Sequence, residues 1–157
     1  MNANKVSGAV ADCSMKIHEA LGPGLLESVY QRILSYELRK ADFEVETEVP
    51  ISVEWDGKKI DEGYRADLIV NQQMLVELKS VEKLDVVHSK QVLTYLKLTN
   101  LNLGLLIKFG APFLKEGIRR IVNNLKEKNL CVSTALREAS THYYESRKPF
   151  FLRAQAS

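Results

Sequence analysis

Cysteine is scarce in this sequence. Only Cys13 and Cys131 occur among the 157 residues, and no CxxC spacing brings two cysteines together. Two isolated cysteines make neither the disulfide framework of a small secreted domain nor a cysteine-based zinc site. The sequence therefore favours a reducing, cytoplasmic setting over an extracellular one.

Long hydrophobic runs are also missing. No stretch approaches the roughly 20 apolar residues that a membrane-spanning helix needs. Residues 1–11 contain no basic segment followed by an apolar run, so the sequence predicts no signal peptide. We expect neither a membrane span nor a membrane partner.

Charge of one sign is not in excess, because the 22 basic residues nearly balance the 20 acidic ones. This balance argues against a polybasic nucleic-acid binder, although a local basic groove is compatible with it. The apolar share of 45% is enough to bury a core, and the length fits one domain. The patterning weakens after about Leu130, which predicts a domain over residues 1–129 and a C-terminal appendage over 130–157.

Two helices are predicted at the start of the chain. Apolar residues recur at spacings of three and four from Val6 to Leu21, which is the period of one helix face. Gly22-Pro23-Gly24 ends this helix, because proline lacks a donor and glycine tolerates turn dihedrals. A second helix is expected from about Leu25 to Lys40.

The period then changes to two. Residues 43–55 alternate between apolar and mostly acidic side chains, which predicts a half-buried strand. Pro50 indicates that this strand is an edge strand or contains a bulge. Asp56-Gly57 predicts a hairpin turn into a strand at about residues 58–70, and a further strand is expected over residues 74–81.

Asp85 is placed to cap a helix that runs to about Leu98, with Val86 and Val87 among its core-facing residues. The nearly continuous apolar run at residues 103–109 predicts a buried strand. Residues 118–125 fit either a helix or a short strand. His88 forms a polar stripe with Gln91 and Tyr95 on this helix, and by itself it is interpreted as an ordering or solvent-exposed histidine rather than a base or ligand.

The two strands around the turn at Gln72 have a predicted antiparallel register. It places Asp67 opposite Glu77 and Ala66 opposite Leu78, and a slip by one residue would mix apolar with charged positions. The apolar face comprises Ala66, Leu68, Val70, Met74, Val76 and Leu78, and the other face Arg65, Asp67, Ile69, Leu75, Glu77 and Lys79.

Carboxylates that face each other across two strands repel. Lys79 shares the face of Asp67 and Glu77, and Arg65, diagonal to Glu77, is interpreted as its neutralising partner. A divalent cation is the other candidate, because carboxylate oxygens are the hard ligands that Mg²⁺ and Mn²⁺ prefer. An ordinary solvated charge cluster has the same spacing, and spacing alone leaves these interpretations level.

Asp67, followed ten positions later by Glu77-Leu78-Lys79, resembles the split D…ExK signature of the PD-(D/E)XK nuclease superfamily. Residues 24–30, GLLESVY, form a GxxExxY motif and resemble the small bacterial GxxExxY branch of that superfamily. Gln91 and Tyr95 resemble the QxxxY element of its exonuclease-like members. The likeness extends over about residues 6–125, with alanine at position 66 where the eponymous signature has proline.

The resemblance implies a restriction-endonuclease-like α/β core in which helices flank a mixed β-sheet. It implies that Asp67, Glu77 and the backbone carbonyl of Leu78 hold Mg²⁺ or Mn²⁺. Glu27 would complete the carboxylate cluster, directly or through a metal-bound water. Lys79 would activate or position the attacking water. The pair Gln91 and Tyr95 would face the same cleft and steady the substrate or Lys79.

The expected function is that of a magnesium-dependent nuclease that hydrolyses phosphodiester bonds, with DNA as the nucleic-acid partner. The alternative is a non-cleaving nuclease-fold module that binds nucleic acid or a protein partner, and a homodimer is left open. Basic residues late in the domain either follow a phosphate backbone or form a solvated surface. These residues are Lys108, Lys115, Arg119, Arg120, Lys126 and Lys128.

Overall fold

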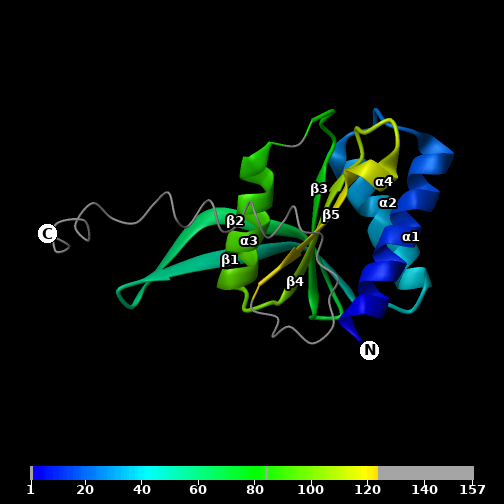
Figure 1. Ribbon diagram of the computed structural model, residues 1–157. Coiled ribbons are helices and arrows are strands. Elements are labelled where there is room, and N and C mark those ends of the chain that lie inside the picture. The colour runs from blue at the N-terminus through cyan, green and yellow to red at the C-terminus, as the bar shows by residue number, and fades with distance from the viewer. Residues whose placement is uncertain (1, 84, 124–157) are drawn as a thin grey trace, which may run out of the picture. The chain divides into compact units, whose positions relative to one another are not determined.

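A five-stranded sheet lies between helices in this structure, a computed structural model that describes residues 2–83 and 85–123 (Figure 1). These residues belong to the unit Met1–Leu125. The predicted appendage over residues 130–157, together with Lys126 and Lys128, lies outside the described residues. None of the helices within the described ranges is long and apolar enough to cross a membrane.

The sheet is mixed. Its strands, in spatial as well as sequence order, are β1 (Val45–Trp55), β2 (Lys58–Val70), β3 (Met74–Lys79), β4 (Leu103–Lys108) and β5 (Ile118–Val122). The pair β3–β4 is parallel and the other neighbours are antiparallel. The helices are α1 (Ala3–Leu21), α2 (Glu27–Lys40), α3 (Val86–Leu98) and the short α4 (Leu114–Gly117). The predicted mixed sheet with flanking helices is thereby confirmed.

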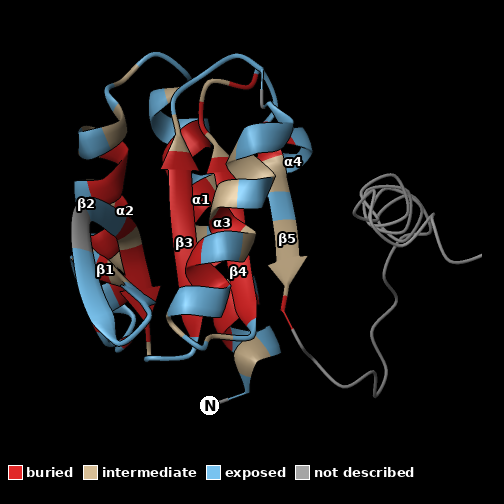
Figure 2. Cartoon of the chain, turned by 90° about the vertical axis from the view of Figure 1, so that its left-hand side faces the viewer, coloured by how far each residue is buried: buried red, intermediate tan, exposed pale blue. Residues whose placement is uncertain are grey.

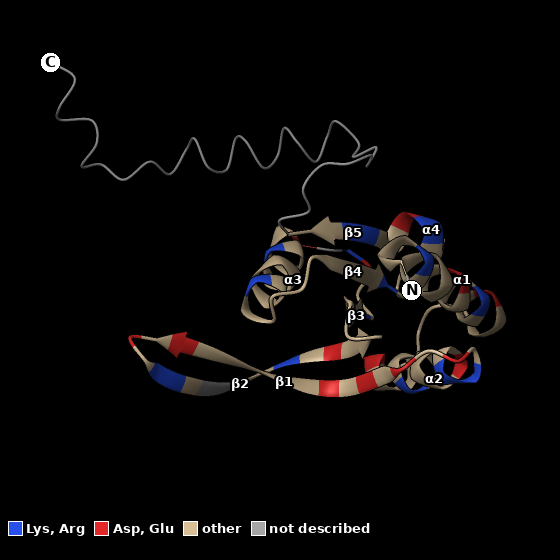
Figure 3. Ribbon diagram, turned by 90° about the horizontal axis from the view of Figure 1, so that it is seen from below, with Lys and Arg blue, Asp and Glu red and all other residues tan. Residues whose placement is uncertain are grey.

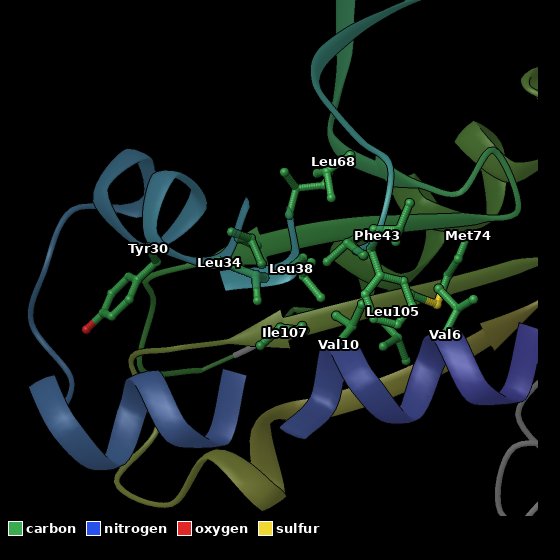
Figure 4. Close-up of a cluster of buried hydrophobic side chains, with 14 of the residues drawn as sticks. Val6, Val10, Tyr30, Leu34, Leu38, Phe43, Leu68, Met74, Leu105 and Ile107 are labelled. Atoms are coloured by element: carbon green, nitrogen blue, oxygen red, sulfur yellow. The ribbon is translucent and has the colours of Figure 1, made fainter. Parts of the chain in front are cut away.

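Each face of the sheet buries its own cluster of side chains. Apolar residues of α1 and α2 pack on one face with Leu68, Val76 and Leu105 (Figure 4). Leu75 and Leu106 pack on the other face with α3. Because both faces are covered, β3 and β4 are buried along most of their length (Figure 2). Burial of each large aliphatic side chain contributes about 1.5–3 kcal/mol.

Tyr30 joins the Gly-Pro-Gly turn to the core. Its hydroxyl donates to the carbonyl of Gly22 at 2.6 Å and accepts from the amide of Leu25 at 3.2 Å. Its ring is fully buried and stacks on Phe109, with 4.1 Å between the ring centroids. The tyrosine of the GxxExxY motif is therefore a packing residue that fixes the start of α2.

Two local predictions are settled by packing. Val86 and Val87, predicted to face the core, are 64% and 58% exposed, because α3 packs through Val92, Tyr95 and Leu96 further along. Residues 118–122 form a strand rather than a helix, since β4 offers them an antiparallel partner. The edge position predicted from Pro50 is confirmed, because β1 lies at the end of the sheet.

The central hairpin keeps the predicted register only next to its turn. Leu68 pairs with Val76 as expected, but the predicted pairs of Asp67 with Glu77 and of Ala66 with Leu78 are absent from the ladder. Ala66 was predicted to share a face with Leu68, and this is wrong, since Ala66 belongs to the cluster under α3. The reason is that β2 leaves β3 at Asp67 and continues with β1 as a twisted ribbon (Figure 3).

Glycine at position 110 is required by a close backbone approach. A Cβ at Gly110 would lie 2.4 Å from the carbonyl oxygen of Val81, which is backbone and cannot rotate away. We expect Gly110→Ala to lower the unfolding free energy by about 3 kcal/mol, measured by urea denaturation. Gly8→Ala, in the exposed α1 surface with no atom within 4 Å of the added Cβ, should raise it by about 0.5–1 kcal/mol. Equal stability of the two variants would contradict this account.

Candidate functional site

The site lies where β2 and β3 separate. The carboxylate of Asp67 accepts a hydrogen bond from the backbone amide of Leu78, with 2.7 Å between Oδ2 and N. This bond replaces the ladder pairing that is lost at this point. Asp67 is therefore fixed directly on the backbone of β3, beside Glu77.

Glu77 is almost completely buried, with 3% of its surface exposed. Its Oε1 accepts a hydrogen bond from Nζ of Lys79 at 2.8 Å. Its Oε2 is buried and has no hydrogen-bond partner among the described residues. Burying a carboxylate oxygen without a hydrogen bond is costly. Oε2 of Glu77 is therefore the atom of this site that is available to a bound group.

Burial raises the pKa of both carboxyl groups. The pKa of Asp67 rises to about 6, chiefly through desolvation, against the opposing hydrogen bond from Leu78. The pKa of Glu77 rises to about 7 through desolvation and then through repulsion by Asp67, against the opposing bond from Lys79. The site thus holds more negative charge than its environment solvates, which is the situation that a cation relieves.

Lys79 remains the ammonium form in this arrangement. Burial alone would lower its pKa, but the hydrogen bond to Glu77 and the nearby carboxylates outweigh burial and raise the pKa. Its side chain is 16% exposed, so the charge is held against the site rather than in solvent. This geometry makes Lys79 a fixed positive charge and hydrogen-bond donor.

Glu27 reaches the same place from the first turn of α2. Its Oε2 accepts from the amide of Ser80 at 3.2 Å, and its Oε1 lies 4.0 Å from Nζ of Lys79. Across the described ranges no three His, Cys, Asp or Glu side chains converge closely enough to hold a metal ion. Glu27 therefore borders the pair Asp67 and Glu77 without forming a three-carboxylate group with it.

The donor chemistry of the site fits a divalent cation. Two carboxylates meet beside a backbone segment, and one of their oxygens, Oε2 of Glu77, has no partner in the described structure. Oxygen ligands of this kind suit Mg²⁺ and Mn²⁺, which complete their coordination with water.

Gln91 and Tyr95 lie on α3, which covers the sheet face to which Leu75 also points. Nε2 of Gln91 donates to the Tyr95 hydroxyl at 2.8 Å, and the Tyr95 ring lies 6.2 Å from that of Tyr64. Within the described ranges no hydrogen bond joins either side chain to Lys79. Their predicted role toward substrate or Lys79 stays a prediction.

His88 has a structural task. Its Nδ1 accepts from the backbone amide of Asp85 at 3.0 Å, while Oδ1 of Asp85 accepts from the amide of Val87. These bonds make a capping box at the start of α3, which confirms the interpretation of His88 as an ordering residue.

Sequence reasoning missed Gln31 and Glu48. Nε2 of Gln31 donates to Oε1 of Glu48 at 2.6 Å and to the backbone carbonyl of Asp67 at 2.9 Å. Arg65 lies 3.9 Å from Glu48, so the interpretation that Arg65 neutralises Glu77 is wrong. The available signal was spacing, because Gln31 follows Glu27 by four residues and shares its helix face.

One of the late basic residues adjoins the site. Lys108 stands directly across from Lys79 in the parallel register of β3 and β4. Its Nζ donates to the carbonyl of Glu82 at 2.9 Å. Arg120 is engaged elsewhere, with its guanidinium bonded to Asn4. Local positive charge near the site thus comes from Lys79 and Lys108.

A hollow of about 690 Å³ lies away from the carboxylates. Its lining includes Met15, His18, Pro23 and Phe113, and none of Asp67, Glu77 and Lys79. His18 is fixed there by a contact of 2.8 Å between Nε2 and the carbonyl of Ala111. The candidate site is therefore identified by the burial and charge of its residues rather than by the size of a cavity.

Comparison with known proteins shows the family to which the chain belongs. A family model described as the PD-(D/E)XK nuclease superfamily matches residues 4–121. The chain therefore belongs to the PD-(D/E)XK nuclease superfamily. A crystal structure of a protein called SSO0001 is similar at 24% identity and a TM-score of 0.47, with 79% of this chain and 61% of that protein covered. The chain thus spans less than two thirds of that protein's length. No curated protein matches the chain.

The raised carboxyl pKa values give the stability a defined pH dependence. The pKa values of Asp67 and Glu77 rise from usual values of 3.8 and 4.5 to about 6 and about 7 on folding. Between these limits the folded state binds more protons than the unfolded state, so stability falls as the pH rises. Without divalent cations, we expect the unfolding free energy from urea titrations to drop by about 4 kcal/mol between about pH 5 and pH 8.

Asp67→Asn should reduce this loss, because an amide cannot ionise and its oxygen can still accept from Leu78. Glu46→Gln, on an exposed glutamate of β1, is the matched control and should keep the wild-type dependence. A wild-type stability that rises over the same pH range would refute the electrostatic account of the site.

Proposed function

We propose that this protein is a metal-dependent nuclease that hydrolyses phosphodiester bonds in DNA. Membership of the nuclease superfamily gives the reaction class. The metal dependence and the substrate are inferred from the site and from the resemblance of its motifs to the GxxExxY branch.

The observation that carries the proposal is the state of Glu77. Its carboxylate is 3% exposed, has one oxygen without a hydrogen-bond partner among the described residues, and is repelled by the half-buried carboxylate of Asp67. A purely structural ion pair would leave Lys79 and Glu77 matched one to one. Asp67 adds a second negative charge that a bound Mg²⁺ or Mn²⁺ would neutralise.

In this proposal Asp67, Glu77 and the Leu78 carbonyl hold the ion, and Glu27 approaches it directly or through water. A divalent cation in such a site polarises the phosphodiester and lowers the pKa of water. Lys79, kept as an ammonium by Glu77, donates hydrogen bonds and orients the attacking water or the phosphate. Gln91 and Tyr95, on the helix that covers this face of the sheet, are proposed to contact the substrate.

The choice of DNA rests on the resemblance, and the position of Lys108 supports a nucleic-acid substrate in general. Lys108 pairs with Lys79 in the register of β3 and β4, so a second cation would lie near the proposed scissile phosphate. Phosphate contacts of this kind bind nucleic acid without regard to sequence. A non-cleaving module with the same fold would bind through Lys108 but would have no use for an unpartnered oxygen on Glu77.

Metal binding should depend on pH and on Asp67. We expect Mn²⁺ titrated into the protein in a calorimeter to bind more tightly as the pH rises from about 5.5 to about 8, because both carboxyl groups must lose their protons first. Asp67→Asn should abolish the heat of binding, while Glu46→Gln should leave it intact. Absence of Mn²⁺ binding to the wild-type protein throughout this range would refute the proposed metal dependence.

Cleavage should depend on Glu77 and Lys79. In an in-gel assay with Mg²⁺ on single- and double-stranded DNA and RNA, we expect Glu77→Gln and Lys79→Met each to slow cleavage on the order of 100-fold or more. Both replacements keep the side-chain volume, so folding can be verified by circular dichroism. Binding of labelled DNA with no cleavage by the wild-type protein would replace this proposal with the non-cleaving module.

A further inference from the structure

Asp67 occupies a gap in the sheet. The register of β1 with β2 passes from the pair of Thr47 with Leu68 to the pair of Val49 with Ala66. The register of β2 with β3 ends at Leu68. In this register Glu48 of β1 lies across from Asp67, but the two are not among the paired residues, and no residue of β3 pairs with Asp67. At such an interruption of the ladder, a backbone carbonyl is stabilised by a further hydrogen-bond partner.

Gln31 is that partner. Its side-chain amide donates to the carbonyl of Asp67 at 2.9 Å and to Oε1 of Glu48 at 2.6 Å. The residue is 8% exposed, so these bonds lie largely out of solvent. Each hydrogen of the amide is thereby matched to one acceptor, and the two acceptors come from adjacent strands.

Glu48 depends on the same contact. Its backbone φ is +54°, in the left-handed region that non-glycine residues rarely adopt, and such a residue persists only where its surroundings hold it. Its carboxylate lies close enough to Asp67 to raise the pKa of that group. The two hydrogen bonds from Gln31 therefore fix Glu48 on β1 and Asp67 on β2, which are the residues at which the pairing of the two strands is irregular.

We infer that Gln31 is a positioning residue that sets where the Asp67 carboxylate stands in the active site. Gln31 holds the backbone carbonyl of Asp67. The backbone position of Asp67 in turn decides whether its carboxylate reaches the amide of Leu78. Glu27, four residues earlier on α2, reaches the end of β3 at Ser80. One face of α2 thus contacts both β2 and β3, the strands that carry Asp67 and Glu77. The catalytic consequence of this role rests on the proposed function, but the positioning itself does not.

The direct test is amide hydrogen exchange at Leu78, followed by NMR in Gln31→Met without metal. Methionine keeps the length of glutamine and removes both hydrogen bonds. We expect the Leu78 amide to exchange about fivefold faster or more, because the Asp67 carboxylate no longer holds a fixed position. Ser35→Ala is the matched control, since Ser35 is also buried on α2 but bonds to the carbonyl of Arg32 within the helix. It should leave the exchange at Leu78 unchanged after correction for global stability.

Mn²⁺ calorimetry links this role to the site. Loss of a residue that orients a metal ligand weakens metal binding about 10–100-fold, and we expect this in Gln31→Met but not in Ser35→Ala. Gln31→Glu should not rescue binding, because a carboxylate cannot donate to Asp67 or Glu48. Wild-type exchange at Leu78 in Gln31→Met would overturn the inference even if the protein binds Mn²⁺ and cleaves DNA. Faster exchange at Leu78 in a protein that binds no Mn²⁺ would support the positioning role while refuting the metal-dependent function.

Discussion

The hydrogen bond between the Asp67 carboxylate and the Leu78 amide is the interaction around which this site is organised. Where β2 leaves β3, a backbone donor of β3 would otherwise lose its partner, and the side chain of Asp67 takes that place. The same bond holds the half-buried Asp67 next to the buried Glu77. One hydrogen bond therefore both satisfies the backbone of β3 and holds a second carboxylate near Glu77. The excess negative charge of the site follows from this second carboxylate.

Helix α2 gives this arrangement its rigidity. Glu27 contacts the end of β3, and Tyr30 stacks on Phe109 and bonds the preceding turn. Gln31 donates to the carbonyl of Asp67, where the pairing of β2 is interrupted. Residues three and four apart lie on one side of a helix, so a single face serves all three tasks. The spacing of the GxxExxY motif is explained by these contacts, with its glutamate at the site and its tyrosine in the core.

Much of the molecule was predictable because its signals are local. The helix stop at Gly22, the hairpin turn at Asp56-Gly57 and the apolar run of β4 follow from residue properties over a few positions. Asp67, Glu77 and Lys79 were predicted together because they lie on two strands joined by a short turn and match the D…ExK signature, although the predicted pair of Asp67 with Glu77 is absent from the ladder. Val86 and Val87 were misplaced because the packed face of α3 depends on where the helix lies on the sheet. Gln31 and Glu48 were missed since their contact joins α2 to β1, far apart in the sequence.

The sequence by itself determined the mixed α/β architecture, the elements that carry the acidic residues and the presence of two carboxylates with a lysine on one hairpin. These features rest on periodicity, turn residues and register, which short segments encode. Only the tertiary structure decided that β2 turns away at Asp67, that Glu77 is buried with an unpartnered oxygen and that Gln31 supports the gap. Burial and long-range hydrogen bonds require several elements to meet, and that meeting depends on the whole packed sheet rather than on any one segment.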